Sequence, residues 1–226
     1  MKTDQATRVS IPVSESSRVS GLLMAPARAT ACFVFAHGAG AGMTHPFMEA
    51  VVAGLAERAI ATIRFQFPYM EAKGKRPDPP KIAHATVRAA VGEAQRALPW
   101  LPLIAGGKSF GGRMTSQAQA AMPLSGVKGL AFFGFPLHAA GQPSAERAQH
   151  LFEVRIPMLF LQGTRDSLAD LGLLHPLTEK LGSRATLTLF EGADHSFHVP
   201  ARSGGTDADV RRRMLDAFAG WASRII

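Results

Sequence analysis

The chain is poor in cysteine, with Cys32 as the single one among 226 residues. One cysteine excludes an internal disulfide and any metal site that requires several thiolates. Cys32 lies within an apolar run, so we expect a small buried side chain there rather than a reactive thiol.

Long apolar runs are also missing. No stretch of about eighteen apolar residues occurs, which excludes a membrane-spanning helix. Residues 1–5 are not followed by the apolar segment that is typical of a secretion signal. We therefore expect a cytoplasmic protein that has no membrane partner.

Acidic residues are the minority charge, because 17 of them stand against 25 basic residues and give a formal net charge of +8. The basic residues are dispersed, and residues 211–213 are their only tight cluster, in a segment of helical periodicity. This distribution favours a solvated helix face, so we expect no specific nucleic-acid partner. Hydrophobic residues make up 46% of the chain, which is typical of globular proteins, and the length fits a single domain over residues 1–226.

Apolar segments of strand character alternate along the chain with segments of helical periodicity. Two strands, 7–13 and 18–25, flank a Ser-Glu-Ser-Ser turn and predict an antiparallel hairpin at the sheet edge. The other expected strands cover 31–36, 60–67, 101–105, 129–135, 156–161 and 185–190. The expected helices cover 45–59, 82–98, 113–122, 168–181 and 207–225. This order predicts an α/β fold with a mostly parallel eight-stranded sheet, helices on both faces and no large lid.

The most informative motif is the G-K-S-F-G sequence of residues 107–111, which follows an apolar strand and precedes a helix. In this strand, turn and helix context a G-x-S-x-G serine sits on a strained turn with its hydroxyl exposed, so Ser109 is the candidate nucleophile. The same residues could end a phosphate-binding loop, but that loop requires a glycine where the chain has Pro102. A chance occurrence in a glycine-rich loop is the other alternative.

A second glycine-rich turn, residues 37–42, follows the strand 31–36. It resembles a dinucleotide fingerprint, but Met43 occupies the position of the third glycine. A turn at this place can instead direct backbone N–H groups at an oxyanion beside the nucleophile. We expect Ala39 and Phe110 to provide these two N–H groups, and His37 to hold the turn in shape.

A nucleophilic serine needs a base and an acid that orients the base, in the chain order serine, acid, histidine. Asp166 follows the strand 156–161, and His195 follows the strand 185–190. We therefore expect Asp166 to orient His195, and His195 to accept the proton of Ser109.

Each of these assignments has an alternative. Asp166 could instead cap the helix that is expected near Leu168, with Asp170 as a less suitable acid. His198 is the rival base, while Asp194 is better placed for a turn. His195 and His198 could form a metal pair, but no third ligand follows at the spacing of a metal site, so we expect no metal and no other cofactor.

Several segments resemble those of the small predicted α/β-hydrolases. They are residues 37–40, 107–113, 135–138, 157–166 and 192–197. That family includes bacterial members, a testis-expressed relative and the hydrolase-like part of a chromatin-complex subunit. The resemblance extends from about Ala31 onward and implies an α/β-hydrolase fold with Ser109, Asp166 and His195 as a catalytic triad. A more distant similarity links the chain to dienelactone hydrolases, which carry a cysteine at the position of Ser109.

Two functions from different classes follow from the sequence. The first is a serine hydrolase that cleaves a small ester, thioester or similar acyl substrate through an acyl-enzyme on Ser109. The second is an interaction module that keeps the hydrolase fold without catalysis, as some relatives do. The intact set of Ser109, Asp166 and His195 favours the hydrolase, because a scaffold does not need all three side chains.

Overall fold

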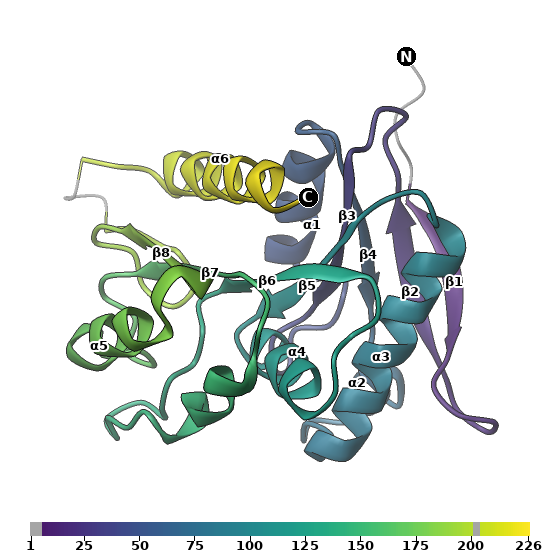
Figure 1. The fold of residues 1–226 in the computed structure, drawn as a ribbon, viewed down its shortest axis with the longest axis horizontal. Helices are drawn as coiled ribbons and strands as arrows, with labels where there is room; N and C mark the ends of the chain where they lie inside the picture. Colours follow the sequence, from purple (N-terminus) through teal and green to yellow (C-terminus); the bar gives the residue numbers. More distant parts are fainter. Residues whose placement is uncertain (1–5, 201–203) are drawn as a thin grey trace.

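The computed structural model describes residues 6–200 and 204–226, which form one twisted sheet covered by helices (Figure 1). The strand order across the sheet is β1-β2-β4-β3-β5-β6-β7-β8. The strands are β1 (Thr7–Pro12), β2 (Arg18–Met24), β3 (Ala31–Ala36), β4 (Ile60–Phe65), β5 (Leu103–Lys108), β6 (Val127–Phe133), β7 (Met158–Gly163) and β8 (Ala185–Phe190). Strands β1 and β2 form an antiparallel hairpin at one edge, and β3 to β8 are parallel. The predicted mostly parallel eight-stranded α/β sheet is confirmed.

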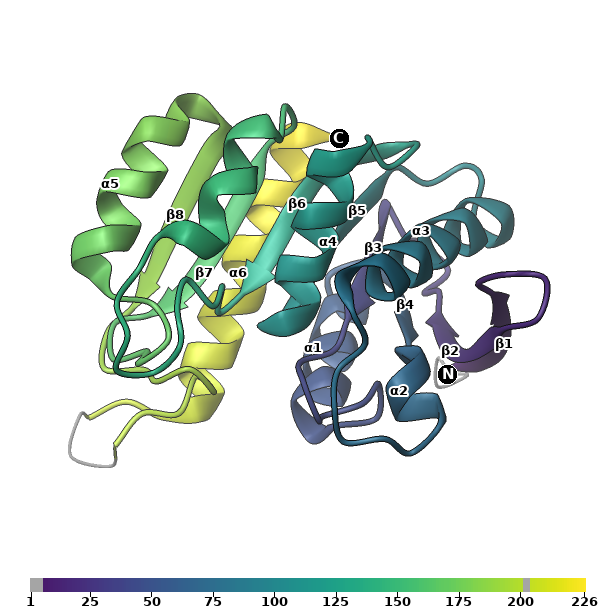
Figure 2. The same ribbon diagram turned by 90° about the horizontal axis from the view of Figure 1, so that it is seen from below.

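Helices cover both faces of the sheet, as predicted (Figure 2). One face carries α1 (Pro46–Ala56) and α6 (Asp207–Ile225), which contact each other. The other face carries α3 (Pro80–Ala97), α4 (Phe110–Ala121) and α5 (Leu171–Leu181). A short helix that the sequence does not predict, α2 (Pro68–Glu71), lies between β4 and α3.

The parallel strands are buried on both sides, and alternate residues of one strand enter different cores. In β3, Cys32 and Val34 join the core under α3, α4 and α5, while Phe33 and Phe35 join the core under α1 and α6. Burial raises the pKa of the Cys32 thiol to about 12, which keeps it protonated and unreactive, as expected.

Two of the strands that lead to candidate site residues, β5 and β7, end later than predicted, whereas β8 has the predicted bounds. Strand β5 reaches Lys108 instead of residue 105, because its polar end remains paired with β6. Strand β7 reaches Gly163 instead of residue 161, because Gln162 pairs with Leu189 of β8. Consequently α4 begins at Phe110 rather than near residue 113, and the turn between β5 and α4 consists of Ser109 alone.

The segment between β6 and β7 contains the 3-10 helix η1 (Glu146–Glu153) and builds no large lid over the sheet edge. The only other 3-10 helix in the described ranges, η2 (Gly182–Arg184), leads into β8. Among residues 6–200 and 204–226, no helix combines the length and the apolar character that crossing a bilayer would require.

Candidate active site

Ser109 occupies a strained turn between β5 and α4. Its backbone has φ 50° and ψ −116°, a conformation that residues with a side chain rarely adopt. The flanking glycines allow the turn, because a Cβ on Gly107 would lie 2.5 Å from the Ala36 oxygen and one on Gly111 would lie 2.5 Å from the His37 oxygen. The turn therefore requires glycine on both sides of the serine.

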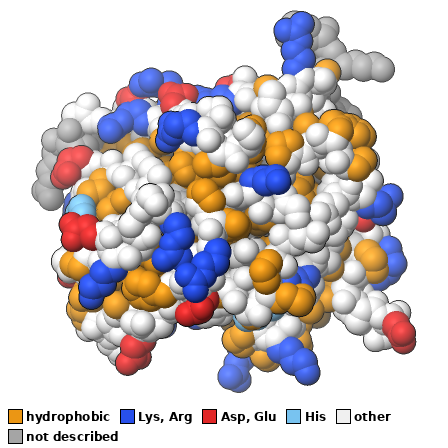
Figure 3. Space-filling model, in the orientation of Figure 1, with side chains coloured by type: hydrophobic (Ala, Val, Ile, Leu, Met, Phe, Trp, Pro, Cys, Tyr) orange, Lys and Arg blue, Asp and Glu red, His pale blue; other side chains and the backbone are white. Residues whose placement is uncertain are grey.

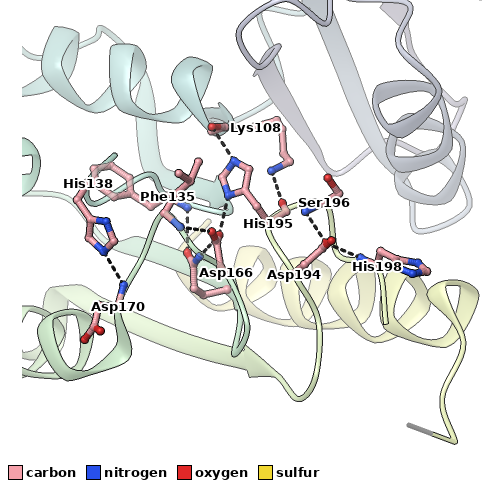
Figure 4. A network of polar contacts seen from close by, with 12 residues as sticks. Lys108, Phe135, His138, Asp166, Asp170, Asp194, His195, Ser196 and His198 are labelled. Atoms are coloured by element: carbon pink, nitrogen blue, oxygen red, sulfur yellow. Dashed lines mark hydrogen bonds and ion pairs between the residues drawn. The ribbon is translucent and has the colours of Figure 1, made fainter. Parts of the chain in front are cut away.

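Ser109, Asp166 and His195, the three residues that the sequence predicts to act together, meet at the carboxyl end of the sheet, and Figure 4 shows the side chains of Asp166 and His195 next to each other. The Ser109 Oγ lies 2.8 Å from the His195 Nε2, and the His195 Nδ1 lies 2.6 Å from an Asp166 carboxylate oxygen. In the neutral ring, Nδ1–H donates to Asp166, so Nε2 is free to accept the proton of the Ser109 hydroxyl. The side chains form one continuous hydrogen-bonded chain from hydroxyl to carboxylate.

Asp166 is held by more partners than His195 alone. Its Oδ2 also accepts from the Gln162 Nε2, and its Oδ1 accepts from the Leu168 backbone N–H at 2.8 Å. Asp166 is not the N-cap of α5, which was the alternative role for this residue, because α5 begins at Leu171 with Asp170 as its N-cap. Asp166 thus shapes the loop before α5 and contacts His195 at the same time.

Gln162 is a residue of this site that the sequence analysis missed. It is fully buried at the end of β7, and its Oε1 accepts from the Phe135 N–H at 2.9 Å. Because the Gln162 Nε2 must then face Asp166, the amide fixes the carboxylate against the histidine. The available signal was a polar residue directly after a run of buried apolar ones.

The rival base, His198, lies outside this network. Its side chain is exposed, and its Nδ1 lies 2.9 Å from an Asp207 oxygen at the start of α6. Asp194 accepts from the backbone N–H groups of Ser196 and His198, which is the turn role that the sequence predicted. Figure 4 shows both side chains on the far side of the loop that presents His195.

Lys108 is a second residue whose role the sequence did not reveal. Its Nζ donates to the His195 backbone oxygen at 2.6 Å and lies within 6 Å of the Phe47 and Phe197 rings. Burial lowers the pKa of Lys108 to about 8, although Asp166 and Asp194 act in the opposite direction. Through its hydrogen bond to the His195 oxygen, the ammonium group connects the loop that contains His195 to the end of β5, directly before Ser109.

The turn of residues 37–42 lies beside Ser109, and His37 fixes its shape. The His37 Nδ1 donates to the Gly38 oxygen at 2.7 Å, and its Nε2 accepts from the Phe67 N–H at 3.2 Å. In the described part of the chain, neither the Ala39 N–H nor the Phe110 N–H has a hydrogen-bond partner. Both are therefore free to donate to an oxygen that is bound next to Ser109.

His37 gives a prediction on acid stability. Burial lowers its pKa to about 4 from an ordinary 6.5, so below pH 6.5 the unfolded chain binds a proton that the folded chain refuses. The free energy of unfolding is therefore expected to fall between pH 6.5 and 4, by about 3 kcal/mol from this residue. Urea unfolding at several pH values will measure it.

The matched comparison for this prediction uses His37→Gln and His175→Gln, the second at an exposed position on α5. His37→Gln is expected to show a shallower pH dependence, by about 1.4 kcal/mol per pH unit near pH 5. His175→Gln should follow the wild type. Equal slopes for the wild type and His37→Gln would show that this histidine is protonated in the folded chain.

An apolar pocket of about 420 Å³ opens beside the Ser109 hydroxyl. It is lined by Gly38, Ala39, Ala41, His45, Phe47, Met48, Lys108, Ser109, Leu168, His195 and Ser196. Ser109 and His195 thus border a cavity that is large enough for a small organic molecule and whose wall is mostly carbon. We call it the apolar pocket below.

Other kinds of site have less support in this fold. Within the described ranges, no group of three or more His, Cys, Asp or Glu side chains is arranged to hold a metal ion. Figure 3 shows Lys and Arg side chains in several separate groups on the face in view rather than in one continuous basic patch. Nucleic-acid binding proteins concentrate such charge along one face or helix.

Comparison with solved structures shows the same architecture in proteins of low sequence identity. A serine hydrolase homologue from Coxiella burnetii has a TM-score of 0.75 at 17% identity, over 96% of this chain and 98% of that one. A dienelactone hydrolase from Anabaena variabilis has a TM-score of 0.73 at 22% identity, over 98% and 96%. An α/β serine hydrolase without a lid, from Xanthomonas campestris, has a TM-score of 0.74 at 19% identity, over 98% and 97%.

The sequence itself matches a known family over most of its length. Residues 29–223 fit the family described as "Alpha/beta hydrolase domain". This range contains β3 to β8 and every residue of the hydrogen-bonded chain from Ser109 to Asp166. The fold and the sequence therefore agree, and the chain belongs to the alpha/beta hydrolase domain family.

Proposed function

We propose that the protein is a serine hydrolase that cleaves an ester, thioester or similar acyl compound through an acyl-enzyme on Ser109. The observation that carries the proposal is the unbroken chain from the Ser109 Oγ through His195 to Asp166, with contacts of 2.8 and 2.6 Å. These are hydrogen-bond distances between a nucleophile, a base and an orienting acid. Family membership and the strained turn at Ser109 add support.

In the first step the Ser109 Oγ attacks the substrate carbonyl carbon while the His195 Nε2 takes the hydroxyl proton. Asp166 stabilises the resulting imidazolium through its bond to Nδ1. The carbonyl oxygen becomes an oxyanion, to which Ala39 and Phe110 donate their backbone N–H groups. The bond to the leaving group then breaks, and His195 returns its proton to the leaving oxygen or sulfur.

The second step releases the acyl group. Water attacks the carbonyl carbon of the acyl-enzyme, and its proton passes to the His195 Nε2. The bond between the Ser109 Oγ and the acyl carbon breaks, and His195 protonates that oxygen. Lys108 holds the backbone of His195 throughout, so the ring keeps its place while it gains and loses a proton.

The direct test is reaction with a fluorophosphonate, which modifies activated serines. We expect one adduct per chain, on Ser109, by mass spectrometry of the proteolysed protein. Ser196 borders the same pocket but lacks the contact with the His195 Nε2, so it serves as an internal control and should remain unmodified. Folded protein without an adduct on Ser109 would refute the hydrolase and favour the interaction module.

A further inference from the structure

A second pocket, of about 380 Å³, also borders Ser109 and contains two arginines. It shares Ala39, Ser109 and Leu168 with the apolar pocket. Its remaining lining residues are Pro77, Asp78, Pro80, Phe110, Arg113, Met114, Pro136 and Arg147. We call it the arginine pocket.

Among the residues that the structure describes, neither arginine of this pocket has a side-chain partner. Arg113 lies in the first turn of α4, and its Nε is shielded from solvent without a hydrogen bond. Within residues 6–200 and 204–226, no carboxylate forms an ion pair with Arg113 or with the exposed Arg147. Arg64 also has an unbonded buried Nε, but its guanidinium donates to the Met43 oxygen and lies 3.9 Å from Glu49.

The surroundings make the Arg113 charge costly. A cation in the first turn of a helix opposes the helix dipole. Burial lowers the pKa of Arg113, and the nearby charge of Arg147 adds to the effect. Asp78 is the one acidic residue in the pocket lining, and its Oδ2 accepts from the Tyr69 N–H at 3.1 Å instead of pairing with an arginine. A bound anion would offset the unfavourable helix dipole, the burial of the Arg113 charge and its repulsion by Arg147.

The position of His195 decides which part of a substrate the arginines meet. The leaving group takes its proton from the His195 Nε2, so it must lie on the side of that ring. His195 lines the apolar pocket and is absent from the lining of the arginine pocket. The leaving group therefore occupies the apolar pocket, and the acyl chain extends into the arginine pocket.

We propose that Arg113 and Arg147 bind a carboxylate at the far end of the acyl chain, so that the preferred substrates are half esters of short dicarboxylic acids. The inference rests on the proposed hydrolase function. Arg113 lies one helical turn after Ser109, and both line the same pocket of about 380 Å³, which accommodates only a short acyl chain between them. A guanidinium matches a carboxylate with two parallel hydrogen bonds, and the chemical steps at Ser109 remain as described.

The test compares monoethyl succinate with ethyl 4-methylpentanoate, whose acyl chain has the same length and branching, with two methyl groups in place of the carboxylate oxygens. Titration of released acid gives kcat/KM for both esters. Because a charge-assisted hydrogen bond contributes about 1.5–3 kcal/mol, we expect a preference of about ten- to a hundredfold for monoethyl succinate. Equal values for the two esters would overturn the subsite.

Variants assign the preference to the arginines. Arg113→Met is expected to abolish it, through a fall in kcat/KM for monoethyl succinate relative to ethyl 4-methylpentanoate. Arg147→Glu, at an exposed position where folding is not at risk, should also abolish it, because the introduced carboxylate would pair with Arg113. Arg155→Met is the matched control, because Arg155 is exposed and pairs with Glu153 away from the pocket. A preference that survives both Arg113→Met and Arg147→Glu would refute the proposal.

A measurement without turnover separates the subsite from the hydrolase. In Ser109→Ala protein, the Arg113 Nε–H resonance is expected to shift saturably with succinate and not with 1,4-butanediol, a neutral molecule of equal chain length. That shift together with an inert Ser109 would contradict the hydrolase alone. Ester hydrolysis with an Arg113 resonance that ignores succinate would contradict the subsite alone.

Discussion

Replacement of Ser109 by alanine is expected to lower kcat for ester hydrolysis by about a million-fold, the size of effect found when the nucleophile of such a triad is removed. The hydroxyl is the only group that forms a covalent bond in the proposed mechanism, and neither His195 nor Asp166 can replace it. The N–H groups of Ala39 and Phe110 remain, so a residual rate above the uncatalysed one should persist. Steady-state kinetics with an activated ester will measure the loss.

The fold should be unaffected by this change, because alanine keeps the Cβ that the strained turn already accommodates. Ser223→Ala serves as the control, since the Ser223 hydroxyl donates only to the Gly220 oxygen within α6. Both variants are expected to unfold at the wild-type temperature. If Ser109→Ala retained most of the ester hydrolysis, the reaction would have to occur at another group.

The parallel sheet and the positions of the candidate site residues could be predicted from the order and the ends of the apolar strands. Apolar runs separated by helical segments require a parallel sheet, and a parallel sheet brings the residues after its strands to one edge. Ser109, Asp166 and His195 each follow such a run, so their meeting could be expected without coordinates. The tight turn at Ser109 could also be predicted from the sequence, because glycines occupy the positions beside it where a Cβ would clash with the backbone.

The contacts that support these residues could not be predicted, because they depend on neighbours far apart in sequence. Gln162 stays in β7 because of its pairing with β8, and only then does its amide reach Asp166. Lys108 matches only the last residues of a phosphate-loop pattern in sequence, and its partner in the structure is the carbonyl of His195, 87 residues away. Arg113 and Arg147 meet because η1 packs on α4, which no local pattern indicates.

Replacement of Asp166 by asparagine is expected to lower kcat/KM by about ten thousand-fold while the backbone stays in place. In the wild type, one carboxylate oxygen accepts from the Leu168 N–H and the other from Gln162 and the His195 Nδ1–H. An asparagine amide has one oxygen and one NH₂ group, so it cannot accept at both sides. If the NH₂ faces His195, the ring proton moves to Nε2, which can then no longer accept from Ser109.

The matched control is Asp170→Asn. Asp170 is the N-cap residue of α5, but its carboxylate forms no capping hydrogen bond with that helix and does not contact His195. Its kcat/KM is expected to remain within about twofold of the wild type. The rate of fluorophosphonate labelling should fall with kcat/KM in Asp166→Asn, because both depend on proton removal from Ser109 by His195. Full labelling with impaired hydrolysis would place the role of Asp166 in the release of the acyl group instead, because the serine would then still be activated without the carboxylate.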